Sequence, residues 1–171
     1  MKIRLANVND IEKIIKVIDD AKLYLRSQNS LQWNLPDGYP NKETMLNDIN
    51  NQNCYILENN EAIIGTMTII IGDDENYYEI DGKWLTSRPY AQIHRIAIKN
   101  EYHHQKLGVY MLMQAEKIIK EKAISSIKID THKANIPMIK TLEELGYTYC
   151  GEIVLKRTKE DNLRNAYEKE I

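Results

Sequence analysis

Residues 91–108 read AQIHRIAIKNEYHHQKLG, a strand-like run followed by a polar loop and the start of a helix. Ile93 to Ile98 is typical of a buried strand, and residues 100–106 are polar and turn-like. From about Gln105 onward the apolar residues recur at helical spacing, which predicts a helix. A strand that runs through a short loop into a helix directs backbone N–H groups and a positive helix end to one point. The stretch therefore predicts an anion site where the helix begins.

The bulk properties indicate one ordinary domain, over residues 1–171. The net charge of −2, from 23 basic and 25 acidic residues, gives no overall field for nucleic acid. No apolar run approaches the roughly 20 residues needed to span a bilayer, and the N-terminus has no secretory pattern. Cys54 and Cys150 are isolated within apolar segments, which predicts reduced, buried thiols in a cytoplasmic protein; a disulfide is the alternative. Neither nucleic acid nor membrane is an expected partner.

The rest of the chain alternates strands and helices. Helices are expected from an N-cap at Asn9 to about Leu25, over Lys42–Asn51 and over Asn135–Leu145. Further strands are expected at Lys2–Ala6, Cys54–Glu58, Ala62–Ile71, Ile124–Asp130, Tyr147–Leu155 and Asn165–Glu170. This order predicts an α/β fold of the α+β type, a mixed sheet of about six or seven strands with helices on both faces. Gly65, inside a β-branched run, is a candidate for a bulge.

The loop and its surroundings resemble the acetyl-CoA-binding segment of the GNAT superfamily of acyl-CoA N-acyltransferases, whose signature is Arg/Gln-x-x-Gly-x-Gly/Ala between a strand and a helix. In one register the signature falls on His103–Gly108, with the last glycine kept and Lys106 at the first glycine. A second register places it on Gln105–Tyr110. The resemblance covers nearly the whole chain and is nearest to small bacterial single-domain members. It implies the GNAT fold and acetyl transfer from acetyl-CoA to a primary amine.

Residues for the cofactor follow from the same resemblance. The backbone of Ile96, Ala97 and Ile98 would hold the pantetheine and the thioester carbonyl. The pyrophosphate would lie on the loop and the first helical turn, formed by His103, His104, Gln105, Lys106, Leu107, Gly108, Val109 and Tyr110. Asn135, Met138 and Leu142 would line the cofactor's path from the next helix; the alternatives are a simple N-cap for Asn135 and a core position for Leu142. For the loop, the alternative is an ordinary capped helix start; for the strand, it is a fully paired core strand.

Catalytic groups are harder to assign, because Leu142 stands where many family members carry the tyrosine that protonates the leaving thiolate. Tyr149 is the favoured replacement acid, ahead of Tyr147, and the alternative is a packed strand tyrosine. His94 and Glu79 are the candidate bases, since an imidazole titrates near neutral pH and a carboxylate can act through water. A hydrogen-bonded structural histidine and a solvated acidic loop are the respective alternatives.

The acceptor site is expected to be aromatic and anionic, which suits a cationic amine. Its candidate residues are Trp33, Tyr39, Trp84 and Tyr90, beside the acidic residues 73–81; the alternative is that the tryptophans close the edge of the core. No histidine spacing matches a zinc signature, so no metal is expected. The competing function is a non-catalytic GNAT-like protein that binds acyl-CoA or serves as a scaffold. A homodimer is compatible with the resemblance.

Overall fold

A computed structural model describes residues 1–158 and 161–171 of the chain. Its helices are α1 (Ile11–Ser27), α2 (Lys42–Asn50), α3 (Leu107–Glu121) and α4 (Ile136–Glu144), with short 3-10 turns η1 (Val8–Asp10), η2 (Glu75–Tyr77) and η3 (Asn100–Tyr102). Its strands are β1 (Lys2–Leu5), β2 (Cys54–Asn59), β3 (Ala62–Ile71), β4 (Asp81–Gly82), β5 (Ala91–Ile98), β6 (Ser126–Thr131), β7 (Thr148–Val154) and β8 (Leu163–Glu170).

The strands follow the order β1-β2-β3-β5-β6-β8-β7-β4. The chain divides into two compact units, Met1–Ile69 with His94–Met111 and Ile70–Ile93 with Leu112–Ile171. Strand β5 therefore contributes Ala91–Ile93 to the second unit and His94–Ile98 to the first. The expectation of one domain over residues 1–171 stays a prediction.

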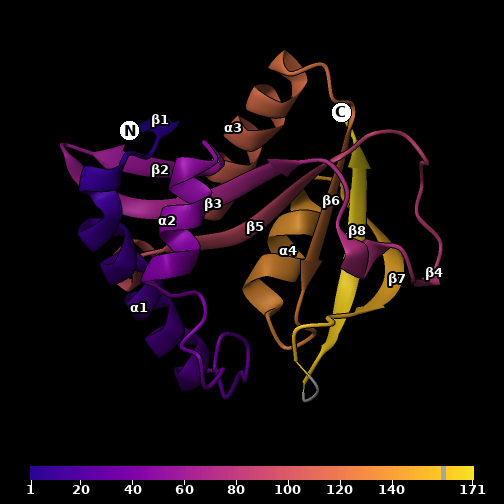
Figure 1. Ribbon diagram of the computed structural model, residues 1–171, viewed down its shortest axis with the longest axis horizontal. Helices are drawn as coiled ribbons and strands as arrows, with labels where there is room; N and C mark the ends of the chain where they lie inside the picture. The colour runs from indigo at the N-terminus through magenta and orange to yellow at the C-terminus, as the bar shows by residue number, and fades with distance from the viewer. Residues whose placement is uncertain (159–160) are drawn as a thin grey trace. The chain divides into compact units, whose positions relative to one another are not determined.

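In the first unit, α1 and α2 lie over one face of β2 and β3 (Figure 1). The core beneath them contains the apolar stripe of α1, which includes Ile14 and Ile18, packed against Cys54 and Ile56 of β2. The opposite face is also covered: a Cβ added at Gly65 would lie 3.0 Å from Met111 Sδ of α3. Both faces of this half of the sheet are therefore buried, which explains the nearly continuous burial of β2 and β3.

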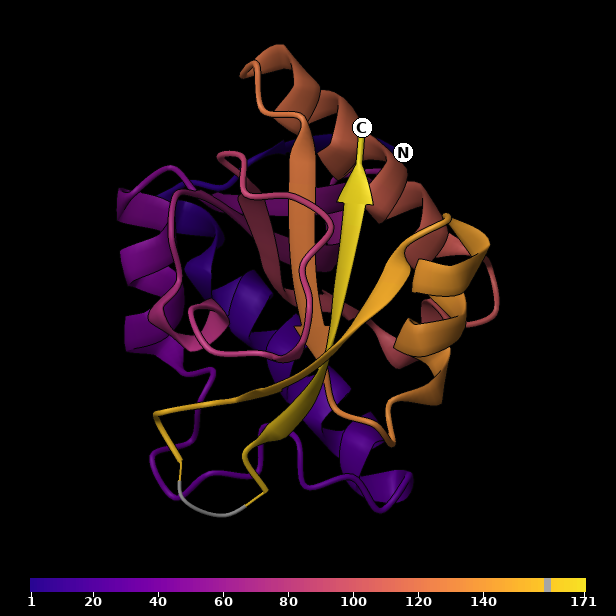
Figure 2. The same ribbon diagram turned by 90° about the vertical axis from the view of Figure 1, so that its right-hand side faces the viewer.

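In the second unit, β6 and β8 run side by side and antiparallel, and β7 pairs with the other edge of β8 (Figure 2). One face of this half is covered by the segment between β3 and β5, whose Tyr77 and Tyr90 pack against Ile153 and Ala166. On the other face, Lys169 of β8 donates to Glu116 of α3 at 2.8 Å. Among the described residues no helix is long and apolar enough to cross a membrane.

The order of elements and the mixed sheet confirm the expected fold, with differences in detail. The described residues form eight strands and not six or seven, because β4 is a two-residue strand inside the segment expected to be an acidic loop. Its Gly82 pairs with Gly151 of β7, and a Cβ added at Gly82 would lie 2.1 Å from the Cys150 carbonyl oxygen. A strand this short has no periodicity to detect.

Two helix starts also differ. The capping box lies earlier than expected, on η1: the Asn7 side chain accepts from Asn9 N–H while Asp10 accepts from Asn7 N–H. Helix α1 itself follows with Asp10 and not Asn9 at its N-cap. Helix α3 begins at Leu107 and not near Gln105, because Lys106 has a left-handed backbone with φ +55° that a right-handed helix excludes. The bulge expected near Gly65 is confirmed: the β2–β3 register shifts between Leu57, the partner of Gly65, and Glu58.

Candidate active site

The second half of β5 begins with a distortion at Arg95, whose backbone is left-handed with φ +50°. Its guanidinium is held by Asp48 of α2, with Nε and Nη2 donating to the two carboxylate oxygens at 2.7 and 2.9 Å. The same carboxylate accepts from Thr68 of β3 at 2.9 Å, and Arg95 Nη1 donates to the Tyr39 hydroxyl at 2.9 Å. This bidentate, largely buried pair fixes the strand in a conformation that a non-glycine residue seldom adopts.

Ile96, Ala97 and Ile98 follow directly after this distortion. The parallel ladder between β5 and β6 joins Ala91 to Ile127 and Gln92 to Lys128, all within the second unit, whereas these three residues belong to the first. The Ile98 carbonyl accepts a hydrogen bond from His103 Nε2 at 3.2 Å. In the first unit, therefore, the end of β5 is tied to the loop that follows it.

The loop is anchored at its start by Asn100, whose backbone N–H and side-chain amide donate to the Asp20 carboxylate at 2.5 and 3.0 Å. His103 then turns back toward β5. Its backbone N–H donates to the Asn100 carbonyl at 3.1 Å, and its ring meets the Tyr24 ring edge-on at 4.5 Å. His103, at the family's arginine place, therefore stabilises the shape of the loop.

Two residues of this loop have left-handed backbones, His104 with φ +63° and Lys106 with φ +55°. Alternating left-handed and right-handed residues form a concave run of N–H groups that suits an anion. Helix α3 starts immediately afterwards, and Tyr110 N–H is bonded to the Lys106 carbonyl at 3.0 Å. The first N–H groups of an α-helix lack intrahelical partners, so Leu107, Gly108 and Val109 add donors and a positive helix end at the same place. Lys106 adopts the conformation for which the family signature uses glycine.

The expected cofactor residues of α4 belong to the second unit. Asn135 caps this helix, its side-chain oxygen accepting from Met138 N–H at 3.3 Å. Met138 is half-buried, whereas Leu142 is completely buried. Asn135 is thus a helix cap and Leu142 a core residue, as the structural alternatives for these two residues predict. The contacts of Asn135, Met138 and Leu142 with a cofactor stay a prediction.

The candidate catalytic residues are divided between the units. His94 is half-buried in the first unit, and Glu79 is exposed in the second. Tyr149 of β7 is 53 % exposed and meets the Tyr167 ring at 5.6 Å. Desolvation, followed by nearby acidic groups, raises the pKa of Tyr149, so its hydroxyl keeps its proton at neutral pH. Tyr147, by contrast, is a buried side chain, and burial raises the pKa of its hydroxyl.

The four aromatic residues expected at the acceptor site also fall in both units. In the first, Trp33 packs against the core under α1, and Tyr39 is bonded to Arg95. In the second, Trp84 and Tyr90 pack beside Tyr77. Both rings already face a cation of the protein itself, since Lys128 Nζ lies 4.4 and 3.9 Å from their ring centres. Their contact with a substrate amine stays a prediction.

Sequence reasoning missed three buried charged residues, Asp48, Lys128 and Glu168, which are each at most 5 % exposed. A weak signal for one of them was present: Lys128 alternates with apolar Ile127 and Ile129, a pattern that assigns it to one face of a strand. Among the described residues no group of three or more His, Cys, Asp or Glu side chains is arranged to hold a metal ion.

Comparison with known proteins agrees with this geometry. The model of the acetyltransferase (GNAT) family matches residues 21–147. A spermidine N(1)-acetyltransferase of Thermoplasma acidophilum is 27 % identical over 141 residues, covering 79 % of this chain and 80 % of that protein. The chain belongs to the GNAT acetyltransferase family, as the signature-like loop predicts, and this membership supports N-acetyltransferase activity in general.

Solved structures show the same fold. A GNAT acetyltransferase of Streptococcus agalactiae superposes with a TM-score of 0.90 at 32 % identity, covering 99 % of this chain and 95 % of that one. The PaiA N-acetyltransferase of Thermoplasma acidophilum, solved in complex with coenzyme A, gives a TM-score of 0.70 at 21 % identity, with 99 % and 98 % covered. The expected GNAT fold is thereby confirmed.

Proposed function

We propose that this protein transfers an acetyl group from acetyl-CoA to a primary amine of a small-molecule or peptide acceptor. The observation that carries the proposal is the left-handed conformation of His104 and Lys106 immediately before α3, in a chain that belongs to this family. A relative with the same fold is described in complex with coenzyme A, which supports the choice of acyl donor. The pyrophosphate would accept hydrogen bonds from the backbone between His104 and Val109.

The end of β5 would hold the reacting end of acetyl-CoA. The backbone groups of Ile96, Ala97 and Ile98 would pair with pantetheine in the manner of an added strand. A backbone N–H there would donate to the thioester oxygen as negative charge develops on it. Because the Asp48–Arg95 pair fixes the preceding backbone, these donors are positioned before the substrate arrives.

The reaction we propose is direct attack by the acceptor nitrogen on the thioester carbonyl. A new C–N bond forms, the C–S bond breaks, the amine loses a proton and the CoA thiolate gains one. Neither cysteine suits a covalent route: both are buried, and burial raises the pKa of Cys54 to about 11. His94, or Glu79 through water, would take the proton from the amine, and Tyr149 would give one to the thiolate.

The first test is isothermal titration of the full chain with acetyl-CoA and with free CoA. Micromolar binding would support the site, and release of thiol in the presence of amines would then report transfer. Spermidine belongs in that panel because a relative that is 27 % identical is a spermidine N(1)-acetyltransferase. Absence of binding at millimolar concentration would overturn the proposal and favour the scaffold alternative. Binding without turnover across the panel would favour the acyl-CoA-binding alternative.

Single substitutions test the roles of the catalytic candidates. Tyr149→Phe keeps the ring that meets Tyr167 and removes only the hydroxyl, so turnover should fall by roughly a hundredfold while CoA affinity is unchanged. Equal rates across the pH range would remove Tyr149 as the acid. His94→Gln and Glu79→Gln, compared in the same pH series, distinguish the two bases, because the true base alone shifts the acidic limb of the profile.

We also infer a cytoplasmic location, supported by two free, buried cysteines. A homodimer stays a prediction, which light scattering of the full chain tests directly.

A further inference from the structure

Lys128 lies in β6 between two buried isoleucines, Ile127 and Ile129, and is itself only 5 % exposed. Its side chain is on the face of β6 that is covered by the segment between β3 and β5. Its cross-strand neighbour is Glu168, which is completely buried. A charged lysine seldom occupies such a position unless it is paired.

The ammonium of Lys128 has ring faces as neighbours in place of hydrogen-bond acceptors. Its Nζ lies 4.4 Å from the Trp84 ring centre and 3.9 Å from that of Tyr90. No described residue places an acceptor within hydrogen-bonding distance of this Nζ, and none forms an ion pair with it. The Glu168 carboxylate instead accepts hydrogen bonds from Leu85, Thr86 and Ser126. The rings therefore favour the charge of Lys128, while none of the described residues accepts a hydrogen bond from its ammonium.

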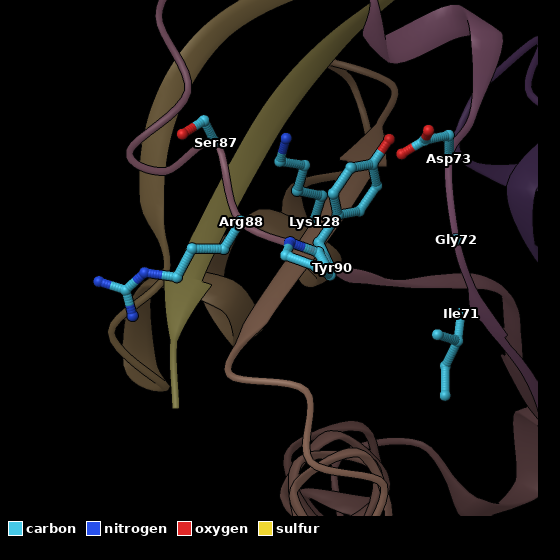
Figure 3. Close-up of a pocket in the computed structure, with 8 residues that line it drawn as sticks. Ile71, Gly72, Asp73, Ser87, Arg88, Tyr90 and Lys128 are labelled. Carbon is cyan, nitrogen blue, oxygen red and sulfur yellow. The ribbon is translucent and has the colours of Figure 1, made fainter.

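A pocket of about 420 Å³ opens at this ammonium (Figure 3). Figure 3 shows the Lys128 side chain beside the Tyr90 ring, with the Asp73 carboxylate at the other end of that ring. Arg88 also lines the pocket, but its guanidinium is turned outward and pairs with Glu170 at 3.1 Å. Lys128 is thus the cation that faces the pocket, and Ser87 and Gly72 are also among the residues that line it.

We propose that this pocket binds the carboxylate or phosphate group of a small molecule, with Lys128 as the main partner of the anion. An entering oxyanion would accept the hydrogen bonds that Lys128 makes to no described residue, and Tyr90 would pack along the attached carbon chain. Burial lowers the pKa of Lys128 and the charge of Glu168 opposes that change, so an additional anion would further favour the charged form. The lining includes Tyr90, one of the residues expected at the acceptor site, and none of the residues from His104 to Val109; the proposal does not rest on acetyl transfer.

The test is titration of the 15N-labelled full chain with sodium phosphate and with sodium acetate, at constant ionic strength set by sodium chloride. Saturable shifts of the backbone amides of Gly72, Asp73, Ser87 and Arg88 are the expected result. Tighter binding in one arm identifies the source, a phosphate-bearing or a carboxylate-bearing ligand. Because this readout uses the unmodified protein, failure of a variant to fold cannot obscure it. The absence of shifts at these amides in both arms overturns the proposal.

Two variants then test the role of the ammonium. Lys128→Met keeps an unbranched stem between the two rings and removes the charge, so anion affinity should fall roughly tenfold to a hundredfold. Lys117→Met, on the exposed side of α3, removes the same charge elsewhere in the second unit and should leave affinity unchanged. Equal affinities in the two folded variants would mean that Lys128 serves only to balance Glu168, and the proposal would be wrong.

Discussion

The pair formed by Asp48 and Arg95 allows a prediction whose sign as well as size can be worked out. The two side chains are 5 % and 10 % exposed, and the carboxylate accepts two hydrogen bonds from the guanidinium. Asp48→Ala leaves the guanidinium buried with the Tyr39 and Thr68 hydroxyls as its remaining partners. Loss of one partner of a buried pair costs about 3–5 kcal/mol in the free energy of unfolding, a large part of the roughly 5–15 kcal/mol available to a domain.

The assay is urea unfolding followed by tryptophan fluorescence, for Asp48→Ala, Arg95→Met and the double variant. Because most of the cost of Asp48→Ala is an unpaired buried charge, the double variant should be more stable than Asp48→Ala alone. If the single variant lost less than about 1 kcal/mol, or if the two single costs simply added, the pair would not be fixing β5 as we describe. Titration with acetyl-CoA on the folded variants would show whether Ile96–Ile98 depend on the same pair.

Three further results are expected. Gly108→Val places a branched side chain in the first turn of α3 and should weaken CoA binding at least tenfold with an unchanged circular dichroism spectrum; unchanged affinity would locate the pyrophosphate elsewhere. Gly65→Ala should lower the free energy of unfolding by roughly 1–3 kcal/mol, because its Cβ would lie 3.1 Å from the Ala97 carbonyl oxygen, and a neutral effect in urea unfolding would contradict the close packing of β3 and β5. Cys54 and Cys150 should resist a disulfide reagent at neutral pH until the protein unfolds, because both are buried and burial raises both thiol pKa values; rapid labelling of the native protein would contradict this.

Much of the fold was predictable because buried positions in helices and strands recur with a regular spacing of apolar residues in the sequence. The stripe of α1 and the apolar runs of β2, β3 and β6 all lie where hydrophobic spacing placed them. The positions that periodicity misplaced are set by backbone dihedrals. The residue types at Lys106 and Arg95 give no indication of a positive φ, because glycine is the residue that most often adopts one. The same limit explains why a two-residue strand, β4, escaped detection.

The parts of the candidate site that are formed by backbone atoms could be predicted from the sequence, whereas the parts formed by side chains were harder to predict. The loop between His103 and Gly108 could be found because a strand, a turn and a helix in succession define it. The pairing of Asp48 with Arg95 joins residues far apart in sequence, and Lys128 gains its significance from Trp84 and Tyr90, which belong to another segment. Such partnerships depend on tertiary contacts, so composition and spacing do not reveal them.

The anchoring of the segment between Gly72 and Tyr90 has a consequence for protein engineering. Its C-terminal part is held by Glu168, whose carboxylate accepts hydrogen bonds from the backbone N–H groups of Leu85 and Thr86. The exposed residues Tyr78 and Glu79 lie earlier in the segment and are not bonded to Glu168. Mutant libraries that vary the stretch around Tyr78 but keep Glu79, the candidate base, can therefore alter the surface it presents while the anchors retain its path.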